Sequence, residues 1–282
     1  GHIGSDESRP IVADLAAALG DEAFRFYPGV AYRHILVVKG HPALLDLAYT
    51  PPHDISDQPV EGREPAGEGA EVLLDLMERA RPVLASSAVN RARAARGELP
   101  ATDVWPFWPG VAPRGLTPFS EKRGVSAALT SGVDLLNGLA VLVGIDRLDI
   151  PGVTDGSDND YRAQIEGALV ALEDHDLVVV HVESPDEEGH AGDVAGKIAA
   201  IEAIDREMVS AVRERLGDIR VLAMPDHPTP VELKTHVGEP VPFVLAGPGI
   251  ALNAGTEFVE TAAAATGLVV DPGHGVMDLL LG

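Results

Sequence analysis

The chain has 282 residues, of which 45% are hydrophobic, so it can bury the core of one large domain or of two modest ones. Cysteine is absent, which excludes disulfides, thiolate metal sites and cysteine nucleophiles and fits a cytoplasmic location. A formal net charge of -23 repels nucleic acid and anionic membranes, so we expect neither as a partner, and no apolar run is long enough to span a bilayer.

The N-terminal part of the chain predicts a small α/β lobe. Residues 10–19 predict a helix, residues 34–38 (HILVV) a buried strand, and residues 69–85 a second helix with apolar side chains at helical spacing. Between them, residues 49–69 are rich in Pro, Asp and Gly and predict a long loop, a feature that is often functional. Residues 97–115 are dense in Pro, Gly and Trp, and we interpret them as the connection to a second domain.

The remainder of the chain alternates strand and helix patterns. Strands are predicted at residues 125–130, 177–182, 219–223 and 242–245, and helices at residues 132–143, 160–173, 194–216 and 275–281. Strands that alternate with helices predict an α/β fold with a mostly parallel sheet flanked by helices. We therefore expect a smaller α/β lobe at residues 1–113 and a sheet domain at residues 114–282.

Two predicted strands end in segments that carry acidic and imidazole side chains. LVVVHV is followed by residues 183–190 (ESPDEEGH), and IRVLAM is followed by residues 225–230 (PDHPTP), with His236 close behind. In open α/β sheets, ligands bind just beyond the carboxyl ends of the strands. We therefore expect these side chains to line one site.

The spacing of these residues allows one ion or two. Asp186 and His190 are four apart, so one helical turn could direct both at a single ion. Asp226 and His227 are adjacent and diverge in extended backbone, so they could serve two neighbouring ions or bridge a cluster. Carboxylates and imidazoles without thiolates suit Mn²⁺, Zn²⁺, Co²⁺ or Fe²⁺, and two such ions stabilise the attacking and leaving oxygens of phosphoryl transfer.

Each of these residues also has a simpler interpretation. Asp is a common turn or helix-capping residue, acidic runs are usually solvated, and His181 inside a strand is more readily a hydrogen-bonded core histidine than a ligand. The joint placement of the other acidic and imidazole residues at strand ends favours a site.

The segments HVESPDEEGHAGD and MPDHPTPVELKTHVGEPVPFVLAGPG resemble the metal-binding signatures of the alkaline phosphatase superfamily. Within it, the chain is most similar to the archaeal-type cofactor-independent phosphoglycerate mutases, whose pattern also fits FYPGVAYRHILV, TPPHDI, VNRARAARGELPATDVW, PGVTDGSDNDY and GKIAAIEAIDREMV. The resemblance implies that residues 114–282 form an alkaline-phosphatase-like core and that residues 1–113 are an inserted lobe that contacts substrate. It implies a metal-dependent interconversion of 3-phosphoglycerate and 2-phosphoglycerate in glycolysis and gluconeogenesis.

The resemblance also assigns roles to residues. One metal ion would be bound by Asp186, His190 and His236, and a second would be bound in part by Asp226 and His227, with Mn, Co or Zn as the ions. The small phosphorylated substrate would be bound by four candidates, Arg33, His53, Arg93 and Lys122. An ordinary surface or structural ion pair is an equally good interpretation of each arginine.

The chain departs from the family pattern at its start. The pattern begins here only at Gly1, whereas the family has an upstream segment that supplies an Asp ligand and the Ser nucleophile, which becomes phosphorylated. We find no match to the nucleophile's context at Ser5, Ser56, Ser86, Ser87, Ser120 or Ser184. We expect the nucleophile upstream of this chain, in a segment that is cleaved, separately encoded or lost.

Two alternatives follow from this departure. One is another metal-dependent phosphatase, phosphotransferase or phosphonate-handling enzyme of the superfamily, which would fit the replacement of family aromatic and Thr-Asn residues by Arg123 and Asn159–Asp160. The other is a catalytically inactive binding protein that keeps the fold.

Residues 1–282 expressed alone should not turn over phosphoglycerate, even with Mn²⁺ or Co²⁺ supplied. Covalent transfer requires a positioned nucleophile, and the metals mainly stabilise charge around it. The measurement is mutase activity beside a His190→Ala control. Turnover that disappears in the control would place the nucleophile within this chain, whereas activity restored only by the upstream segment supports the expectation.

Overall fold

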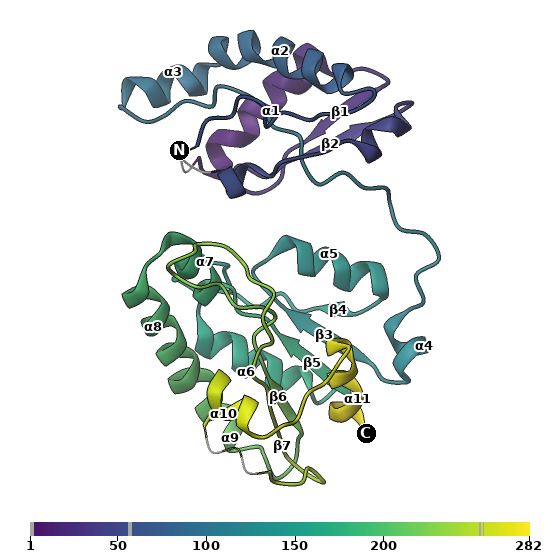
Figure 1. The fold of residues 1–282 in the computed structure, drawn as a ribbon, viewed down its shortest axis with the longest axis vertical. Coiled ribbons are helices and arrows are strands. Elements are labelled where there is room, and N and C mark those ends of the chain that lie inside the picture. The colour runs from purple at the N-terminus through teal and green to yellow at the C-terminus, as the bar shows by residue number, and fades with distance from the viewer. Residues whose placement is uncertain (1–2, 56–57, 254, 256) are drawn as a thin grey trace. The chain divides into compact units, whose positions relative to one another are not determined.

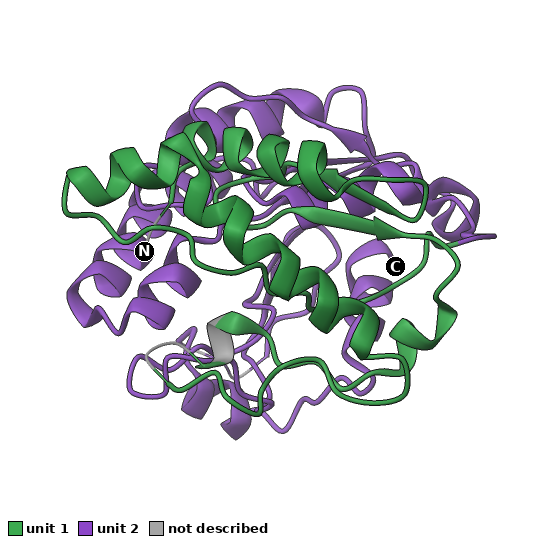
Figure 2. Ribbon diagram, turned by 90° about the horizontal axis from the view of Figure 1, so that it is seen from above, with its two compact units in different colours: residues 1–113 green, residues 114–282 purple. Residues whose placement is uncertain are grey.

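The computed structural model describes residues 3–55, 58–253, 255 and 257–282. The chain divides into two compact units, Gly1–Pro113 and Arg114–Gly282, which are coloured separately in Figure 2. Each unit builds its core from its own elements, so each is described by itself. Whether unit 1 is an insertion that contacts substrate, and unit 2 a metal-binding core, remains a prediction.

In unit 1, helix α1 packs against a strand and against a second helix (Figure 1). The elements are α1 (Ser5–Leu19), β1 (Phe24–Tyr27), β2 (Ile35–Val38), α2 (Glu71–Ser86) and α3 (Ala88–Ala95), with short 3-10 helices at Pro42–Asp46 and Pro52–Ile55. Apolar side chains recur every three to five residues along α1 and α2, which places them on one face of each helix. The buried core residues are Ile11, Leu15 and Leu19 from α1 and Leu76, Ala80 and Leu84 from α2.

The strand predicted at residues 34–38 is present as β2 but is not buried. β2 pairs antiparallel with β1, with Phe24 opposite Val38. Leu36 and Val38 pack against the apolar clusters of unit 1, whereas Ile35 is 63% exposed. A two-stranded sheet that is packed on one face buries only alternate residues, so the prediction of a buried strand was wrong.

Unit 2 is built around a three-stranded parallel sheet of order β4-β3-β5 (Figure 1). Strand β3 (Ala127–Thr130) pairs with β4 (Asp146–Arg147) and with β5 (Leu177–Val180). Helices α5 (Asp134–Val143) and α6 (Tyr161–Ala171) form the connections that parallel pairing requires. Because the strands are parallel, the segments that follow β3 and β5 leave the sheet at the same edge.

Helix α6 packs on β5 and contributes three of the four buried residues of the main apolar cluster of unit 2. Its buried residues Tyr161, Ile165 and Ala168 pack with Met208 and with the partly buried Val178. Helix α4 (Phe119–Arg123) precedes β3. After β5 come the helical segments α7 (Ser184–Ala191), α8 (Val194–Ala203), the π-helix Ile204–Val209 and α9 (Ser210–Arg213). The chain then continues through β6 (Val221–Ala223), β7 (Val244–Ala246), α10 (Glu260–Ala265), the 3-10 helix Gly273–Gly275 and α11 (Val276–Leu281). The long helix predicted at residues 194–216 is thus present as three consecutive helical segments.

The mostly parallel arrangement predicted from the sequence holds for β3, β4 and β5 but not for the last two strands. β6 and β7 pair with each other in antiparallel orientation, with Leu222 opposite Leu245, in a separate two-stranded sheet. Their connection, residues 224–243, contains turns but no α-helix. Because a parallel pair needs a long crossover that is usually helical, this connection returns the chain antiparallel.

Among the described residues, no helix combines the length and the apolarity needed to cross a membrane.

His175 joins the end of α6 to the start of β4. Its Nδ1 lies 2.9 Å from the Ala171 carbonyl oxygen and its Nε2 lies 3.1 Å from Asp146 Oδ2. The Ala171 carbonyl first, and the Asp146 carboxylate second, raise the pKa of His175 above its ordinary value. Since the folded pKa is raised, protonated His175 contributes stability at pH values below its unfolded pKa of about 6.5, and this contribution is lost as pH rises through the folded pKa.

His175→Gln should therefore lower the melting temperature more at pH 5.5 than at pH 9. Thermal unfolding followed by circular dichroism across this range measures the difference. His274→Gln, at an exposed histidine of the same unit, is the control and should show no such pH dependence. An equal loss at both pH values for His175→Gln would contradict the assignment.

Candidate metal centre

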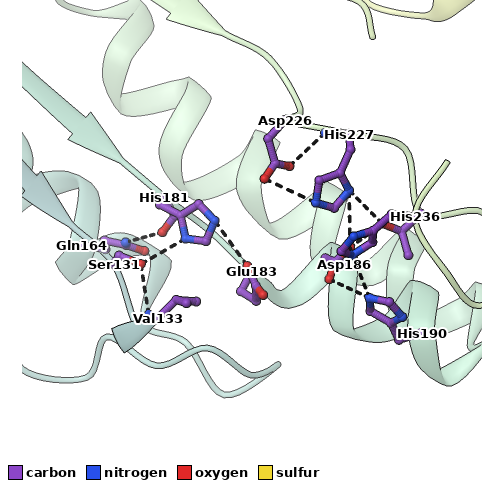
Figure 3. A network of polar contacts seen from close by, with 11 residues as sticks. Ser131, Val133, Gln164, His181, Glu183, Asp186, His190, Asp226, His227 and His236 are labelled. Atoms are coloured by element: carbon purple, nitrogen blue, oxygen red, sulfur yellow. Dashed lines mark hydrogen bonds and ion pairs between the residues drawn. The ribbon is translucent and has the colours of Figure 1, made fainter. Parts of the chain in front are cut away.

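Carboxylate and imidazole side chains from two segments of unit 2 converge at one place (Figure 3). Asp186 and His190 lie on α7, which begins four residues after β5 ends. Asp226, His227 and His236 lie on the connection between β6 and β7. From the sequence we expect these five residues to line one site, and the structure brings them close to one another.

Asp186, His190 and His236 direct their polar atoms at one another. Asp186 Oδ2 lies 3.2 Å from His190 Nε2, and Asp186 Oδ1 lies 3.4 Å from His236 Nε2. The two Nε2 atoms are 2.9 Å apart. One carboxylate and two imidazole nitrogens that face a common point, without any thiolate, form a donor set that suits a divalent ion such as Mn²⁺, Co²⁺ or Zn²⁺.

The His227 ring adjoins the same cluster. It lies against the His236 ring, with 3.8 Å between the ring centroids and an angle of 32° between the ring planes, and its Nδ1 lies 3.9 Å from Asp186 Oδ1. One ligand atom each from Asp186, His227 and His236 lies within 4.8 Å of the others, so these three form a second possible donor set. Asp226 adjoins the cluster through His227, whose Nε2 lies 3.4 Å from Asp226 Oδ2.

The backbone fixes how His190 presents its ring. His190 Nδ1 lies 3.0 Å from the Lys234 carbonyl oxygen, and a carbonyl oxygen can only accept a hydrogen bond. Nδ1 therefore carries the hydrogen, and Nε2 turns its lone pair toward the cluster, as a metal-binding histidine requires. Lys234 adopts a left-handed backbone conformation with φ of 56°, where the connection between β6 and β7 turns back to α7.

A chain of hydrogen bonds adjoins the cluster at the edge of the parallel sheet (Figure 3). Ser131 Oγ lies 3.0 Å from His181 Nδ1 and accepts a hydrogen bond from the Val133 N–H. His181 Nε2 lies 3.2 Å from Glu183 Oε2. Since the Ser131 hydroxyl is free to donate to Nδ1, Nε2 carries the ring hydrogen and donates to Glu183. The interpretation of His181 as a hydrogen-bonded histidine is consistent with these contacts.

Buried amides hold His181 from its other side. The buried side chain of Gln164 donates to the His181 carbonyl oxygen at 2.9 Å and accepts from Asn159 Nδ2 at 2.9 Å. Ser131 and Gln164 are not among the site residues expected from the sequence, whereas Glu183 begins the segment 183–190 that was expected to line the site. The position of Ser131 directly after β3, at the edge where β5 also ends, is the signal that could have indicated it.

Arg93, a predicted substrate ligand, is buried in unit 1 with only 3% of its side chain exposed. Its guanidinium forms an ion pair with Glu7 and lies 3.4 Å from Glu98, and Nε donates to the Leu99 carbonyl oxygen at 3.0 Å. These contacts tie α3 to α1 and supply carboxylates for the positive charge. The structure thus supports a structural role for Arg93.

The other predicted substrate ligands are not gathered into a described site. Arg33 is exposed in unit 1, with its guanidinium carbon 4.7 Å from the centroid of the Tyr32 ring, and Lys122 is exposed on α4 of unit 2. The side chain of His53 lies outside the described part of the structure, as do Ser56 and the residues Gly1 and His2, where the family pattern begins.

The fold and the cluster together define a class: an α/β protein with a candidate centre for divalent metal ions. Comparison with known proteins agrees with this class, since residues 30–270 match the model of the metalloenzyme superfamily. The 2,3-bisphosphoglycerate-independent phosphoglycerate mutase of Methanothrix thermoacetophila is 42% identical over 285 residues, which cover all of this chain and 71% of that protein.

Two solved structures are similar as well. One is a Pyrococcus horikoshii protein with a TM-score of 0.79 and 25% identity, matched over all of this chain and 69% of its own. The other is the cofactor-independent phosphoglycerate mutase of Thermoplasma acidophilum, with a TM-score of 0.55 and 27% identity over 98% of this chain and 69% of its own. The chain belongs to the metalloenzyme superfamily and, within it, to the family of 2,3-bisphosphoglycerate-independent phosphoglycerate mutases.

Gly189 allows α7 to approach the segment that carries His227. A Cβ atom at this position would lie 2.6 Å from the Thr229 carbonyl oxygen and 3.1 Å from Lys197 Nζ. A carbonyl oxygen of the main chain cannot move away without moving its segment. The close approach between the two ligand-bearing segments therefore depends on the absence of a side chain at residue 189.

Gly189→Ala should destabilise unit 2 by about 1–3 kcal/mol, the usual range for overpacking, and weaken Mn²⁺ binding. The matched control is Gly138→Ala on α5, where a Cβ would meet nothing within 4 Å. There the same change should be neutral or stabilising by about 0.5–1 kcal/mol. Urea unfolding and equilibrium dialysis with Mn²⁺ measure both effects. If the two variants behave alike, the close approach at Gly189 has no importance for the centre.

Proposed function

We propose that the protein interconverts 3-phosphoglycerate and 2-phosphoglycerate by phosphoryl transfer that depends on divalent metal ions. The observation that carries this proposal is the convergence of Asp186, His190 and His236, because the segments that resemble the family's metal-binding signatures meet in space with their donor atoms within 3.4 Å of one another. Relatives that are about 40% identical over the whole chain and bear the mutase name support the reaction.

The residues present fit two ions of the Mn, Co or Zn type. Asp186, His190 and His236 would hold one, and Asp226 with His227 would contribute to a second. When bound, such ions stabilise the charge on the attacking and leaving oxygens of phosphoryl transfer. The protein's own part is to direct the donor atoms in advance, which it does for His190 by the contact of Nδ1 with the backbone carbonyl of Lys234.

The substrate of this reaction is a small phosphorylated anion, which the net charge of -23 does not attract as a whole. Its recognition therefore falls to the metal ions and to local cations. Arg33 and Lys122 are exposed and keep this proposed role, and His53 is proposed with them. We propose residues 1–113 as the substrate-contacting lobe, residues 114–282 as the alkaline-phosphatase-like core, and the cytoplasm and the glycolytic pathway as the setting.

The replacements of family aromatic and Thr-Asn residues by Arg123 and Asn159–Asp160 have structural explanations. Arg123 forms an ion pair with Asp278 near the C-terminus. Asn159 is buried; its side-chain oxygen accepts a hydrogen bond from the Thr154 N–H, and its side-chain nitrogen donates one to Gln164. Asp160 caps the start of α6 by accepting a hydrogen bond from the Ala163 N–H. Since each of these side chains is engaged in holding the fold, these replacements give no reason to prefer a different phosphorylated substrate.

Asp186→Asn should weaken Mn²⁺ binding and abolish mutase activity while leaving the fold intact. The amide keeps the shape but removes the negative charge that the centre needs, so Mn²⁺ affinity should fall by more than the roughly 10–100-fold that loss of an outer-shell partner costs. Glu187→Gln, at an exposed carboxylate on the same helix, is the control and should bind Mn²⁺ normally. Equilibrium dialysis measures binding on residues 1–282.

Mutase activity is then assayed on residues 1–282 together with the upstream segment that is expected to supply the nucleophile, with Mn²⁺ present. We expect turnover that Asp186→Asn removes and Glu187→Gln retains. Metal binding at this centre without any isomerisation of phosphoglycerate would overturn the proposed reaction and favour the catalytically inactive binding protein.

A further inference from the structure

One buried hydroxyl touches residues from both predicted metal sites. Thr229 is 4% exposed and lies on the connection between β6 and β7. Its Oγ1 contacts Asp186 Oδ1 and lies 3.3 Å from His227 Nδ1. Asp186 belongs to the first proposed metal site and His227 to the second, so the Thr229 hydroxyl stands between them.

The hydrogen-bonding capacity of these groups determines the direction of each bond. A carboxylate only accepts, so the single hydroxyl hydrogen of Thr229 is donated to Asp186. The Thr229 oxygen is then left as an acceptor toward His227, and His227 Nδ1 must carry the ring hydrogen. His227 Nε2 is consequently the bare nitrogen, and it faces Asp226 Oδ2 at 3.4 Å. Two acceptors that face each other at this distance are what a cation between them would stabilise.

The position of Thr229 is itself fixed from two sides. Lys197 Nζ, on α8, donates to the Thr229 carbonyl oxygen at 2.6 Å. Gly189 of α7 leaves the room that the Thr229 carbonyl and methyl groups occupy. The neighbouring Pro228 carbonyl accepts from the Val237 N–H at 3.1 Å, which closes the connection on itself. The backbone of Thr229, from which the hydroxyl projects, is therefore held in place by contacts that do not depend on a metal.

We propose that Thr229 is a positioning residue that couples the two metal sites: its hydroxyl orients the Asp186 carboxylate and fixes the tautomer of His227 so that Nε2 is available to bind a metal ion. The inference rests on the proposed metal-dependent function. Its consequence is that loss of the hydroxyl frees His227 to carry its hydrogen on Nε2, which blocks that nitrogen as a ligand.

The test compares Thr229→Val, which removes the hydroxyl at nearly constant shape, with Thr229→Ser, which keeps it. Thr130→Val is the matched control, because Thr130 is a fully buried threonine of the same unit outside the cluster. Nitrogen-15 NMR of the imidazole rings in the metal-free chain reports the tautomer of His227. Equilibrium dialysis with Mn²⁺ reports affinity and the number of ions bound.

We expect hydrogen on His227 Nδ1 in the wild type and in Thr229→Ser, and a loss of this preference in Thr229→Val. Mn²⁺ affinity should fall about 10–100-fold in Thr229→Val, as for other outer-shell partners, and change little in Thr229→Ser and Thr130→Val. Hydrogen on Nε2 of His227 in the wild type would overturn the inference even if Thr229→Val fails to fold. An unchanged tautomer and affinity in folded Thr229→Val would overturn it as well.

The two proposals fail in different ways. A wild-type chain that binds no Mn²⁺ overturns the proposed function, while the tautomer measurement on the metal-free chain still decides whether Thr229 orients His227. A chain that binds Mn²⁺ equally well with and without the hydroxyl overturns the role of Thr229 and leaves the proposed function standing.

Discussion

The candidate centre depends on one carboxylate, that of Asp186, which is 19% exposed in the first turn of α7. One of its oxygens faces His190, and the other faces His236, His227 and the Thr229 hydroxyl. A carboxylate offers about four acceptor positions, so a single side chain of α7 organises donors from two segments. Without its negative charge, three imidazoles within a few ångströms of one another would have no common partner, and neither proposed metal site would keep its geometry.

The connection between β6 and β7 shows how strongly the centre shapes the fold around it. These residues, 224–243, contain no α-helix and no strand, so no regular hydrogen-bond pattern holds them. They are held by hydrogen bonds of their own, such as that from the Val237 N–H to the Pro228 carbonyl, and by contacts to the helices that carry or flank the ligands: Lys197 donates to the Thr229 carbonyl, and His190 donates to the Lys234 carbonyl. The acidity of the whole chain favours accumulation of cations near such a site, while the imidazoles select ions that accept nitrogen ligands.

Much of this arrangement was predictable from the sequence, because it follows from short-range rules. The four-residue spacing of Asp186 and His190 places them on one face of a helix, and the sequence placed Asp and His after strands where ligands gather. The antiparallel return of β7 and the exposure of Ile35 were not predicted, since they depend on which strands find partners. The ion pair of Arg93 could not be predicted either, because its partner Glu7 lies 86 residues away in the chain. The contacts of Thr229 could not be predicted for a different reason: no sequence spacing marks a threonine whose hydroxyl will lie between two ligands.

We propose that Asp186, His190 and His236 hold a divalent ion. A crystal structure of the protein grown with Mn²⁺, with anomalous diffraction recorded at a wavelength where manganese scatters, tests this assignment. We expect an anomalous peak about 2 Å from an Asp186 oxygen and from the Nε2 atoms of His190 and His236, as ligand bonds require. Manganese bound elsewhere on this acidic chain, with the Asp186 cluster closed on itself and free of any peak, would contradict it.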